Sequence, residues 1–75
     1  MNYQTDKRFG AKLRTLRVQR HLTQEQLSAM LQLRGLDLTR SALAKIEAGQ
    51  RHVYLDELII LRQILGVAYE DLLEP

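Results

Sequence analysis

The chain contains no cysteine and no tryptophan, and its one proline is the last residue. The absence of cysteine excludes disulfide frameworks and cysteine-ligated metal sites, and it is typical of proteins in a reducing cytosol. No apolar run approaches the roughly 18 residues that a membrane span requires, and the stretch from Met1 to Lys7 is too polar for a signal peptide. These absences predict a cytoplasmic protein with no membrane partner.

Strand-like alternation and internal repeats are also absent, whereas apolar residues recur at helical spacing. Phe9, Leu13 and Leu16 follow the pattern i, i+4, i+7, which places them on one face of a helix. A chain of 75 residues has room for one domain, which at this size buries only about 60% of its unfolded surface. The sequence therefore predicts an all-α fold, a compact bundle of five short helices.

Capping residues mark where the expected helices begin and end. Thr23 with Gln26 three positions later forms a capping-box pattern, and Thr39 precedes a second apolar-periodic run. Leu72 and Leu73 are expected to fold back onto the core, while residues 1–4 are expected to fray. Glycines 35, 49 and 66 are placed to end three of the helices. The expected helices run from a cap at Thr5 or Asp6 to about Arg20, and over about 24–34, 40–48, 55–65 and 69–73.

Charge is unevenly distributed along the chain, although the net charge is only +2. Residues 1–51 contain ten Lys and Arg against four Asp and Glu, whereas residues 52–75 contain one arginine against five acids. This asymmetry favours one surface that meets a polyanion, although solvated faces of ordinary helices would give the same pattern.

Four segments carry a resemblance to a known family. They are Leu13-Arg14-Thr15-Leu16-Arg17, Leu22-Thr23-Gln24-Glu25-Gln26-Leu27, Leu43-Ala44-Lys45-Ile46-Glu47-Ala48-Gly49, and Leu65-Gly66-Val67 followed by Asp71-Leu72-Leu73. In this order and spacing, the chain resembles the lambda-repressor-like (Xre, phage Cro and repressor type) helix-turn-helix DNA-binding domains over about residues 9–73. The resemblance implies that residues 1–75 form a single DNA-binding domain whose second and third helices are the helix-turn-helix. About five extra residues, 32–36, lengthen the connection between these helices, and we expect the second helix to gain most of a turn and to end at Gly35.

The resemblance implies that the third helix enters the major groove of DNA. Arg40, Ser41 and Lys45 would then face the bases, since Arg and Lys donate to guanine O6 and N7. The alternative is that Arg40 and Lys45 are solvated or touch phosphate. Gln24, Thr39, Arg34 and Arg51 are the expected phosphate contacts, whereas Arg8, Lys12 and Arg14 are equally compatible with a solvated helix surface.

Arg17 and Glu47 match the family positions that form a partly buried ion pair between the first and third helices, so a structural role is expected for them. The two histidines, His21 and His52, are isolated and have no second ligand at metal spacing, so we predict no metal and no cofactor. Ser28 and Ser41 lack a histidine and acid arrangement that would support nucleophilic catalysis. The sequence therefore predicts that the protein is not an enzyme.

The predicted function is that of a phage or bacterial transcription regulator, a repressor that occupies a two-fold symmetric double-stranded DNA operator as a homodimer. Apolar residues of the acidic last third are the expected dimer surface, although each of them could equally complete the core: Val53, Tyr54, Ile59, Ile60, Ile64, Tyr69 and Leu73. The alternative is a protein-interaction module or antitoxin of the same fold that acts mainly through a protein partner.

Overall fold

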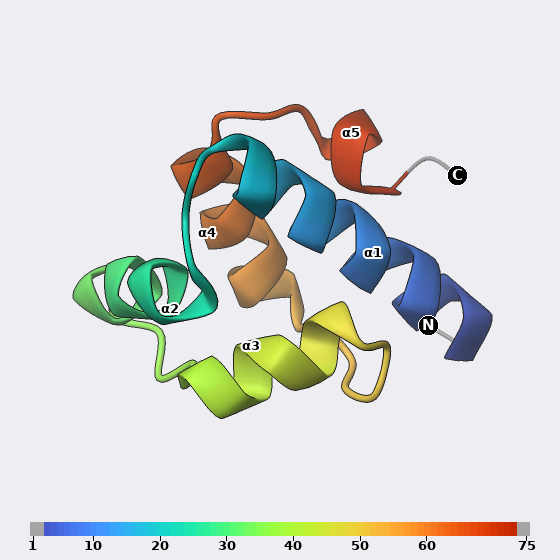
Figure 1. The fold of residues 1–75 in the computed structure, drawn as a ribbon, viewed down its shortest axis with the longest axis horizontal. Coiled ribbons are helices and arrows are strands. Elements are labelled where there is room, and N and C mark those ends of the chain that lie inside the picture. The colour runs from blue at the N-terminus through green and yellow to red at the C-terminus, as the bar shows by residue number, and fades with distance from the viewer. Residues whose placement is uncertain (1–2, 74–75) are drawn as a thin grey trace.

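The computed structural model describes residues 3–73, and five α-helices make up its regular structure (Figure 1). They are α1 (Tyr3–Gln19), α2 (Gln24–Leu33), α3 (Arg40–Glu47), α4 (Leu55–Leu65) and α5 (Tyr69–Leu73). No strand occurs among these residues, so the all-α prediction is confirmed. α3 lies along one edge of the molecule, with α2 and the N-terminal half of α1 beside it, and α5 covers the opposite edge (Figure 1). Within the described range, no helix has the length and apolar character of a membrane span.

The helix starts of the helix-turn-helix follow the predicted caps. The Thr23 hydroxyl accepts from the Gln26 backbone N–H at 3.0 Å, and the Gln26 side chain accepts from the Thr23 N–H at 2.8 Å. The Thr39 hydroxyl accepts from the Ala42 N–H at 3.1 Å. These bonds satisfy N–H groups that have no partner within the helix, so the chain turns into α2 and α3 at defined residues.

The lengthened connection between α2 and α3 is closed by Gly35, as predicted. Gly35 has a φ of 88°, the Leu36 N–H donates to Leu31 O at 3.1 Å, and the Gly35 N–H donates to Gln32 O at 3.0 Å. This pair of bonds is the Schellman arrangement, which requires a left-handed residue that glycine adopts without steric cost. α2 therefore ends cleanly, and the remaining residues of the connection run directly to the cap of α3.

The connection is also anchored to the core of the protein. Leu38 is fully buried, and its carbonyl accepts from the Ser28 hydroxyl of α2 at 2.7 Å. The residue that precedes the Thr39 cap is thus fixed by packing and by a hydrogen bond to α2. This arrangement holds the start of α3 against α2 despite the longer connection.

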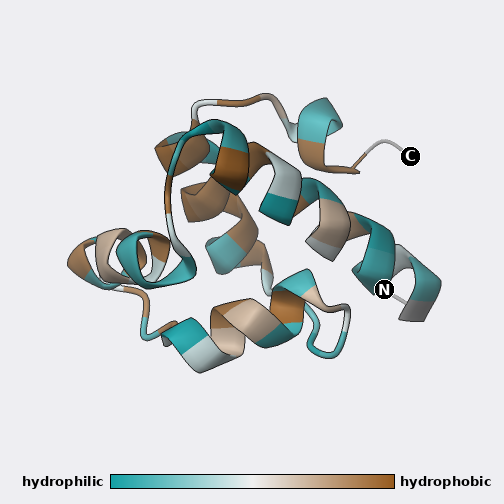
Figure 2. Ribbon diagram, in the orientation of Figure 1, coloured by the Kyte–Doolittle hydropathy of each residue, from teal (hydrophilic) through white to brown (hydrophobic). Residues whose placement is uncertain are grey.

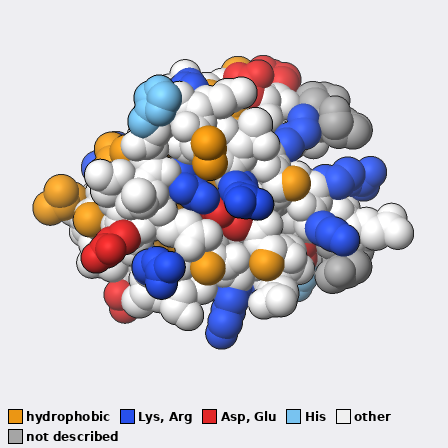
Figure 3. Space-filling model, in the orientation of Figure 1, with side chains coloured by type: hydrophobic (Ala, Val, Ile, Leu, Met, Phe, Trp, Pro, Cys, Tyr) orange, Lys and Arg blue, Asp and Glu red, His pale blue; other side chains and the backbone are white. Residues whose placement is uncertain are grey.

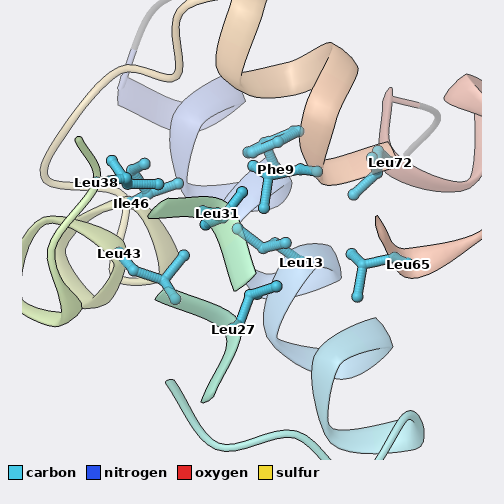
Figure 4. Close-up of a cluster of buried hydrophobic side chains, with 10 residues drawn as sticks. Phe9, Leu13, Leu27, Leu31, Leu38, Leu43, Ile46, Leu65 and Leu72 are labelled. Atoms are coloured by element: carbon cyan, nitrogen blue, oxygen red, sulfur yellow. The ribbon is translucent and has the colours of Figure 1, made fainter. Parts of the chain in front are cut away.

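The core lies between α1, α2, α3 and α4, and Figure 2 shows the strongly apolar α4 in the middle of the molecule. Its fully or nearly fully buried side chains, most of them shown in Figure 4, are Phe9, Leu13, Leu27, Leu31, Leu38, Leu43, Ile46, Leu61, Leu65 and Leu72. Leu72 folds back onto this core as predicted, but the prediction for Leu73 was wrong. Leu73 is 52% exposed, because neighbouring residues of a helix point in different directions and only one of the two faces inward.

The first helix begins earlier than predicted. Residues 3 and 4 are helical rather than frayed, and residues 1 and 2 lie outside the described range. Asp6 is therefore inside α1 and is not its cap. Its buried carboxylate pairs with the His52 side chain in the α3–α4 loop, so α1 and this loop are held together at the N-terminal end of the molecule.

α1 packs directly against the C-terminal end of α3 at Gly10. A Cβ atom at Gly10 would lie 2.2 Å from Ile46 O and 2.6 Å from Glu47 O, both of them backbone atoms. Only a residue without a side chain permits this approach of the two helices. The close contact places α1 beside the helix that the sequence predicts to read DNA.

Candidate nucleic-acid interface

The two faces of α3 differ in burial and in whether their side chains already have partners. Leu43 and Ile46 are buried in the core and attach the helix to the domain. Arg40, Ser41 and Lys45 are exposed on the other side, and their side chains make no hydrogen bond or ion pair with residues 3–73. The face that contains α3 carries several Lys and Arg side chains (Figure 3). The predicted base-facing residues are thus held out on an anchored helix, where their donors are available to a ligand.

Arg17 and Glu47 are brought together across 30 positions of sequence. Arg17 Nε donates to Glu47 Oε2 at 2.7 Å and Nη2 donates to Oε1 at 3.1 Å, while Nη1 donates to Leu22 O at 2.7 Å. Both side chains are at least nine-tenths buried. This bidentate ion pair connects α1 to the last residue of α3. The bond from Arg17 to Leu22 O also connects α1 to the loop before α2.

Gln24 joins the same network at the start of α2. Its Nε2 donates to Glu47 Oε1 at 3.0 Å. An ionised carboxylate only accepts hydrogen bonds, so the amide nitrogen must point inward and the orientation of this side chain is fixed by chemistry. Because Nε2 has a second hydrogen, a phosphate contact of Gln24 stays compatible with this bond and stays a prediction.

An open cleft runs between α1, the start of α2 and α3, and Arg17, Glu47 and Gln24 lie in it. The other lining residues are Arg14, Thr23, Glu25, Arg40, Ala44 and Ala48. Arg17 and Glu47 neutralise each other, which leaves two arginines and one glutamate, a net charge of +1. The cleft is therefore a cationic hollow beside the outer face of α3, where an anionic chain would lie next to Arg40.

The other predicted phosphate contacts are placed differently. The Thr39 hydroxyl caps α3 as an acceptor and keeps its own proton for donation. Arg34 is at the far end of α2, where its guanidinium donates to the Gln63 side chain of α4. Arg34 therefore lies apart from the cleft. Its role as a phosphate contact stays a prediction, without a geometric link to Arg40.

Arg51 is bound within its own loop. Its Nη1 and Nη2 donate to the two carboxylate oxygens of Glu57 at 2.9 and 3.0 Å, and its guanidinium lies over the Tyr54 ring at 5.0 Å from the centroid. Burial of the Glu57 carboxyl opposes its ionisation, but hydrogen bonds from Arg51 and from the Tyr54 N–H outweigh burial and lower the pKa of Glu57. The bond to Glu57 raises the pKa of Arg51. The positive charge of Arg51 is already compensated by Glu57, so a phosphate would have to compete with this carboxylate for the guanidinium.

Several tertiary contacts were not expected from the sequence, among them Asp6 with His52, Gln24 with Glu47, and Arg51 with Glu57. Only the last had a local indication, because Glu57 occupies the third position of α4, from which a carboxylate reaches back to the residue before the helix. The other two depend on how α1 crosses the end of α3.

The arrangement of α2 and α3 defines a helix-turn-helix protein, and comparison with known proteins agrees. A helix-turn-helix family model matches residues 13–72, so the chain belongs to this family, of the lambda-repressor-like, Xre type. The crystal structure of the DNA-binding domain of BldD is similar, with 30% sequence identity, a TM-score of 0.82 and coverage of 97% of this chain and 99% of that chain. The S. venezulae BldD DNA-binding domain has 30% identity and a TM-score of 0.78, with 93% and 97% covered. No curated protein sequence matches the chain.

Proposed function

We propose that this chain is a sequence-specific transcription repressor that inserts α3 into the major groove of an operator as a homodimer, and that it acts by occupying DNA rather than by catalysis. Membership of the helix-turn-helix family and the likeness to the BldD DNA-binding domains support DNA as the partner. The residues described here act as one domain in this proposal.

The observation that carries the proposal is the division of α3 into a buried and an exposed face. Leu43 and Ile46 hold the helix, while Arg40, Ser41 and Lys45 point away from the core without partners among residues 3–73. Arg and Lys donors match the O6 and N7 acceptors of guanine, and a serine hydroxyl pairs with a base or a phosphate. Arg40 opens the helix, which is the end that a recognition helix presents to the bases.

The dimer is required by the small number of base pairs that one helix reads. Two copies related by a two-fold axis would place their α3 helices in successive major grooves about 34 Å apart, on an operator with the same symmetry. Of the seven predicted dimer-surface residues, three pack against the core (Val53, Ile60 and Ile64) and three are exposed (Tyr54, Tyr69 and Leu73). Ile59 is half-buried. The dimer surface proposed here is therefore restricted to the exposed residues of that set.

Selection from a randomised duplex pool tests the proposal. We expect the wild-type chain to enrich a two-fold symmetric motif. Arg40→Ala should change or lose one position in each half-site, because that position loses its donor pair. The matched control is Arg34→Ala, which removes an exposed arginine that bonds to Gln63 of α4 outside the cleft; because a phosphate contact carries no sequence information, the motif should be unchanged. Failure of the wild-type chain to enrich any motif would contradict sequence-specific recognition.

A second function, binding to a protein partner, is favoured by large apolar side chains on the surface. Leu33 at the end of α2 is 88% exposed, and Tyr54 and Leu55 at the start of α4 are exposed as well. The salt dependence of duplex binding separates the two functions. Several phosphate contacts would make affinity fall steeply between about 50 and 200 mM salt, whereas a flat dependence or no duplex binding would favour the protein partner.

A further inference from the structure

We infer that Arg14 of α1 is a DNA-phosphate contact, and that the α3–α4 loop with Arg51 is not one. The DNA backbone would then be held on the α1 and α2 side of α3. This inference rests on the proposed function, because it names which residues position the same DNA duplex that α3 would read.

The position of Arg14 is fixed by its neighbour Arg17. Residues three apart on a helix share a face, so Arg14 lies one turn away from Arg17 on the side of α1 that meets α3. Arg17 binds Glu47 at the end of α3, and both arginines line the cleft that also contains Arg40. Arg14 thus borders the outer face of the recognition helix, although it belongs to a different helix.

The charge of Arg14 is available to a ligand. Arg14 is exposed and forms no hydrogen bond or ion pair with any other described residue, whereas the deeper Arg17 is neutralised by Glu47. Glu25 is the remaining carboxylate of the cleft, and Arg14 and Arg40 are the two arginines there whose side chains have no partner among residues 3–73. An anion entering the cleft therefore meets a surplus of guanidinium donors.

The α3–α4 loop, which leaves the C-terminal end of α3, carries the reverse balance of charge. Arg51 is bound to both oxygens of Glu57, and His52 is bound to Asp6. Asp56 adds a further exposed carboxylate beside Glu57, where its oxygen accepts the Glu57 N–H. Lys7 also lies against this loop, beside Gly49. Because the three carboxylates still outnumber Arg51 and Lys7, a phosphate placed here would meet more repulsion than in the cleft, where Glu25 is the one carboxylate besides the paired Glu47.

A phosphodiester oxygen is the chemistry that Arg14 would recognise. A guanidinium donates to phosphate in a charge-assisted bond, and such a bond positions a protein on DNA without reading sequence. Each phosphate neutralised releases condensed counterions, which adds about 0.9 to the slope of log affinity against log salt. The inference therefore has a readout that a purely structural role of Arg14 would not change.

The test compares the wild-type chain with Arg14→Gln and Arg51→Gln on one duplex, by fluorescence anisotropy over a range of KCl concentrations. The probe is a duplex that contains the selected motif. If selection yields no motif, a duplex of any one fixed sequence is used. The comparison requires that the wild-type chain binds this duplex with an affinity that depends on salt. We expect Arg14→Gln to bind several-fold more weakly and to reduce the salt slope by about 1, with an unchanged preference for sequence. Arg51→Gln should keep the wild-type slope. Circular dichroism at the assay temperature confirms that each variant is folded.

The outcomes are distinguishable. An unchanged slope for folded Arg14→Gln, or an equal loss of slope for Arg51→Gln, would overturn the inference while the proposed function stands. If the wild-type chain binds no duplex, or binds without salt dependence, the proposed function fails and the inference fails with it. A reduced slope for Arg14→Gln alone supports both.

Discussion

Two arginine–carboxylate pairs flank the C-terminal end of α3, and they differ in reach and in burial. Arg17 and Glu47 join residues 30 positions apart, and their side chains are 9% and 3% exposed. Arg51 and Glu57 are six positions apart within one loop and helix start, and their side chains are 26% and 9% exposed. The first pair connects separate helices, whereas the second pins a loop onto the helix that follows it.

The difference shows which contacts determine the geometry of the candidate nucleic-acid interface. A buried charge without its partner has lost both water and its counter-charge, so the long-range pair is costly to break. The Arg51 side chain is partly exposed and can turn to solvent when its partner is lost, so the local pair contributes less. The position of α3 relative to α1 and α2 therefore depends on Arg17 and Glu47, while Arg51 and Glu57 determine only the exit from α3.

The largest expected effect comes from breaking the buried pair. Glu47→Leu leaves the Arg17 guanidinium buried without its carboxylate and removes the acceptor of Gln24, so we expect a loss of about 3–5 kcal/mol in the free energy of unfolding. A loss of this size is a large share of the stability of a small domain. Urea denaturation followed by circular dichroism measures it.

The double variant Arg17→Met/Glu47→Leu provides the control. Removing both charges removes the uncompensated group, so the double variant should recover most of the stability that either single change loses. Losses that add in the double variant would contradict the assignment of a coupled buried pair.

Gly10→Ala should cause the next largest loss in the free energy of unfolding. The added methyl group meets two backbone carbonyl oxygens of α3, which cannot move aside as a flexible side chain would. We expect a loss of about 1–3 kcal/mol from the forced separation of α1 and α3, although alanine favours a helix over glycine. The matched control is Ala11→Gly at the neighbouring exposed position, which should cost only about 1 kcal/mol through helix propensity. A Gly10→Ala variant as stable as the wild type would show that the helices are not in close contact.

Glu57→Gln tests the local pair and has a defined pH dependence. The pKa of Glu57 is lower in the folded chain than its ordinary value of about 4.3, so its contribution to stability is present above that pH and is lost as the pH falls through the folded-state value. We expect Glu57→Gln to be about 1 kcal/mol less stable than wild type at pH 7, and we expect this difference to be smaller at about pH 2. A difference that is the same at both pH values would contradict the ion pair as its source.

The smallest expected effect concerns the turn that presents Leu22 O to Arg17. His21 has a φ of 57°, in the left-handed region that glycine tolerates better than other residues. His21→Gly removes the backbone strain of a non-glycine residue at positive φ, but it also increases the conformational freedom of the unfolded chain. Because the first term is the larger, we expect the free energy of unfolding to rise by a few tenths of a kcal/mol. Thermal unfolding beside the wild type measures it, and His21→Ala, which keeps the strain, should show no gain.

Much of the fold could be predicted because helix starts and ends depend on residues that are close together in the chain. Thr23, Thr39 and Gly35 act on backbone groups within a few residues, so caps and helix ends follow from spacing alone. The apolar periodicity then identifies the inward faces, as for Phe9 and Leu13 of α1. The membership of the helix-turn-helix family was recognisable from four short segments in order.

The contacts that surround the candidate site could not be predicted in the same way. Thr5 or Asp6 is the predicted cap of α1, but both lie inside this helix, and Asp6 pairs with His52 of the α3–α4 loop. Arg51 follows α3 in sequence, which suggested a free phosphate donor, but the third residue of α4 captures it. Both outcomes depend on where separate elements meet in space, and helical periodicity contains no information on that point.

One face of α3 attaches the helix to the core and the other face is exposed, so relatives of this chain can differ on the exposed face without losing the fold. Exchanges at Arg40, Ser41 or Lys45 leave Leu43 and Ile46 in place, so they should change the free energy of unfolding by no more than about 0.5 kcal/mol. Substitutions there can accumulate by mutation without passing through variants that fail to fold. If α3 reads DNA as proposed, target preference and stability are separable traits. A library randomised at these three positions without proline would then explore new operators with most members folded.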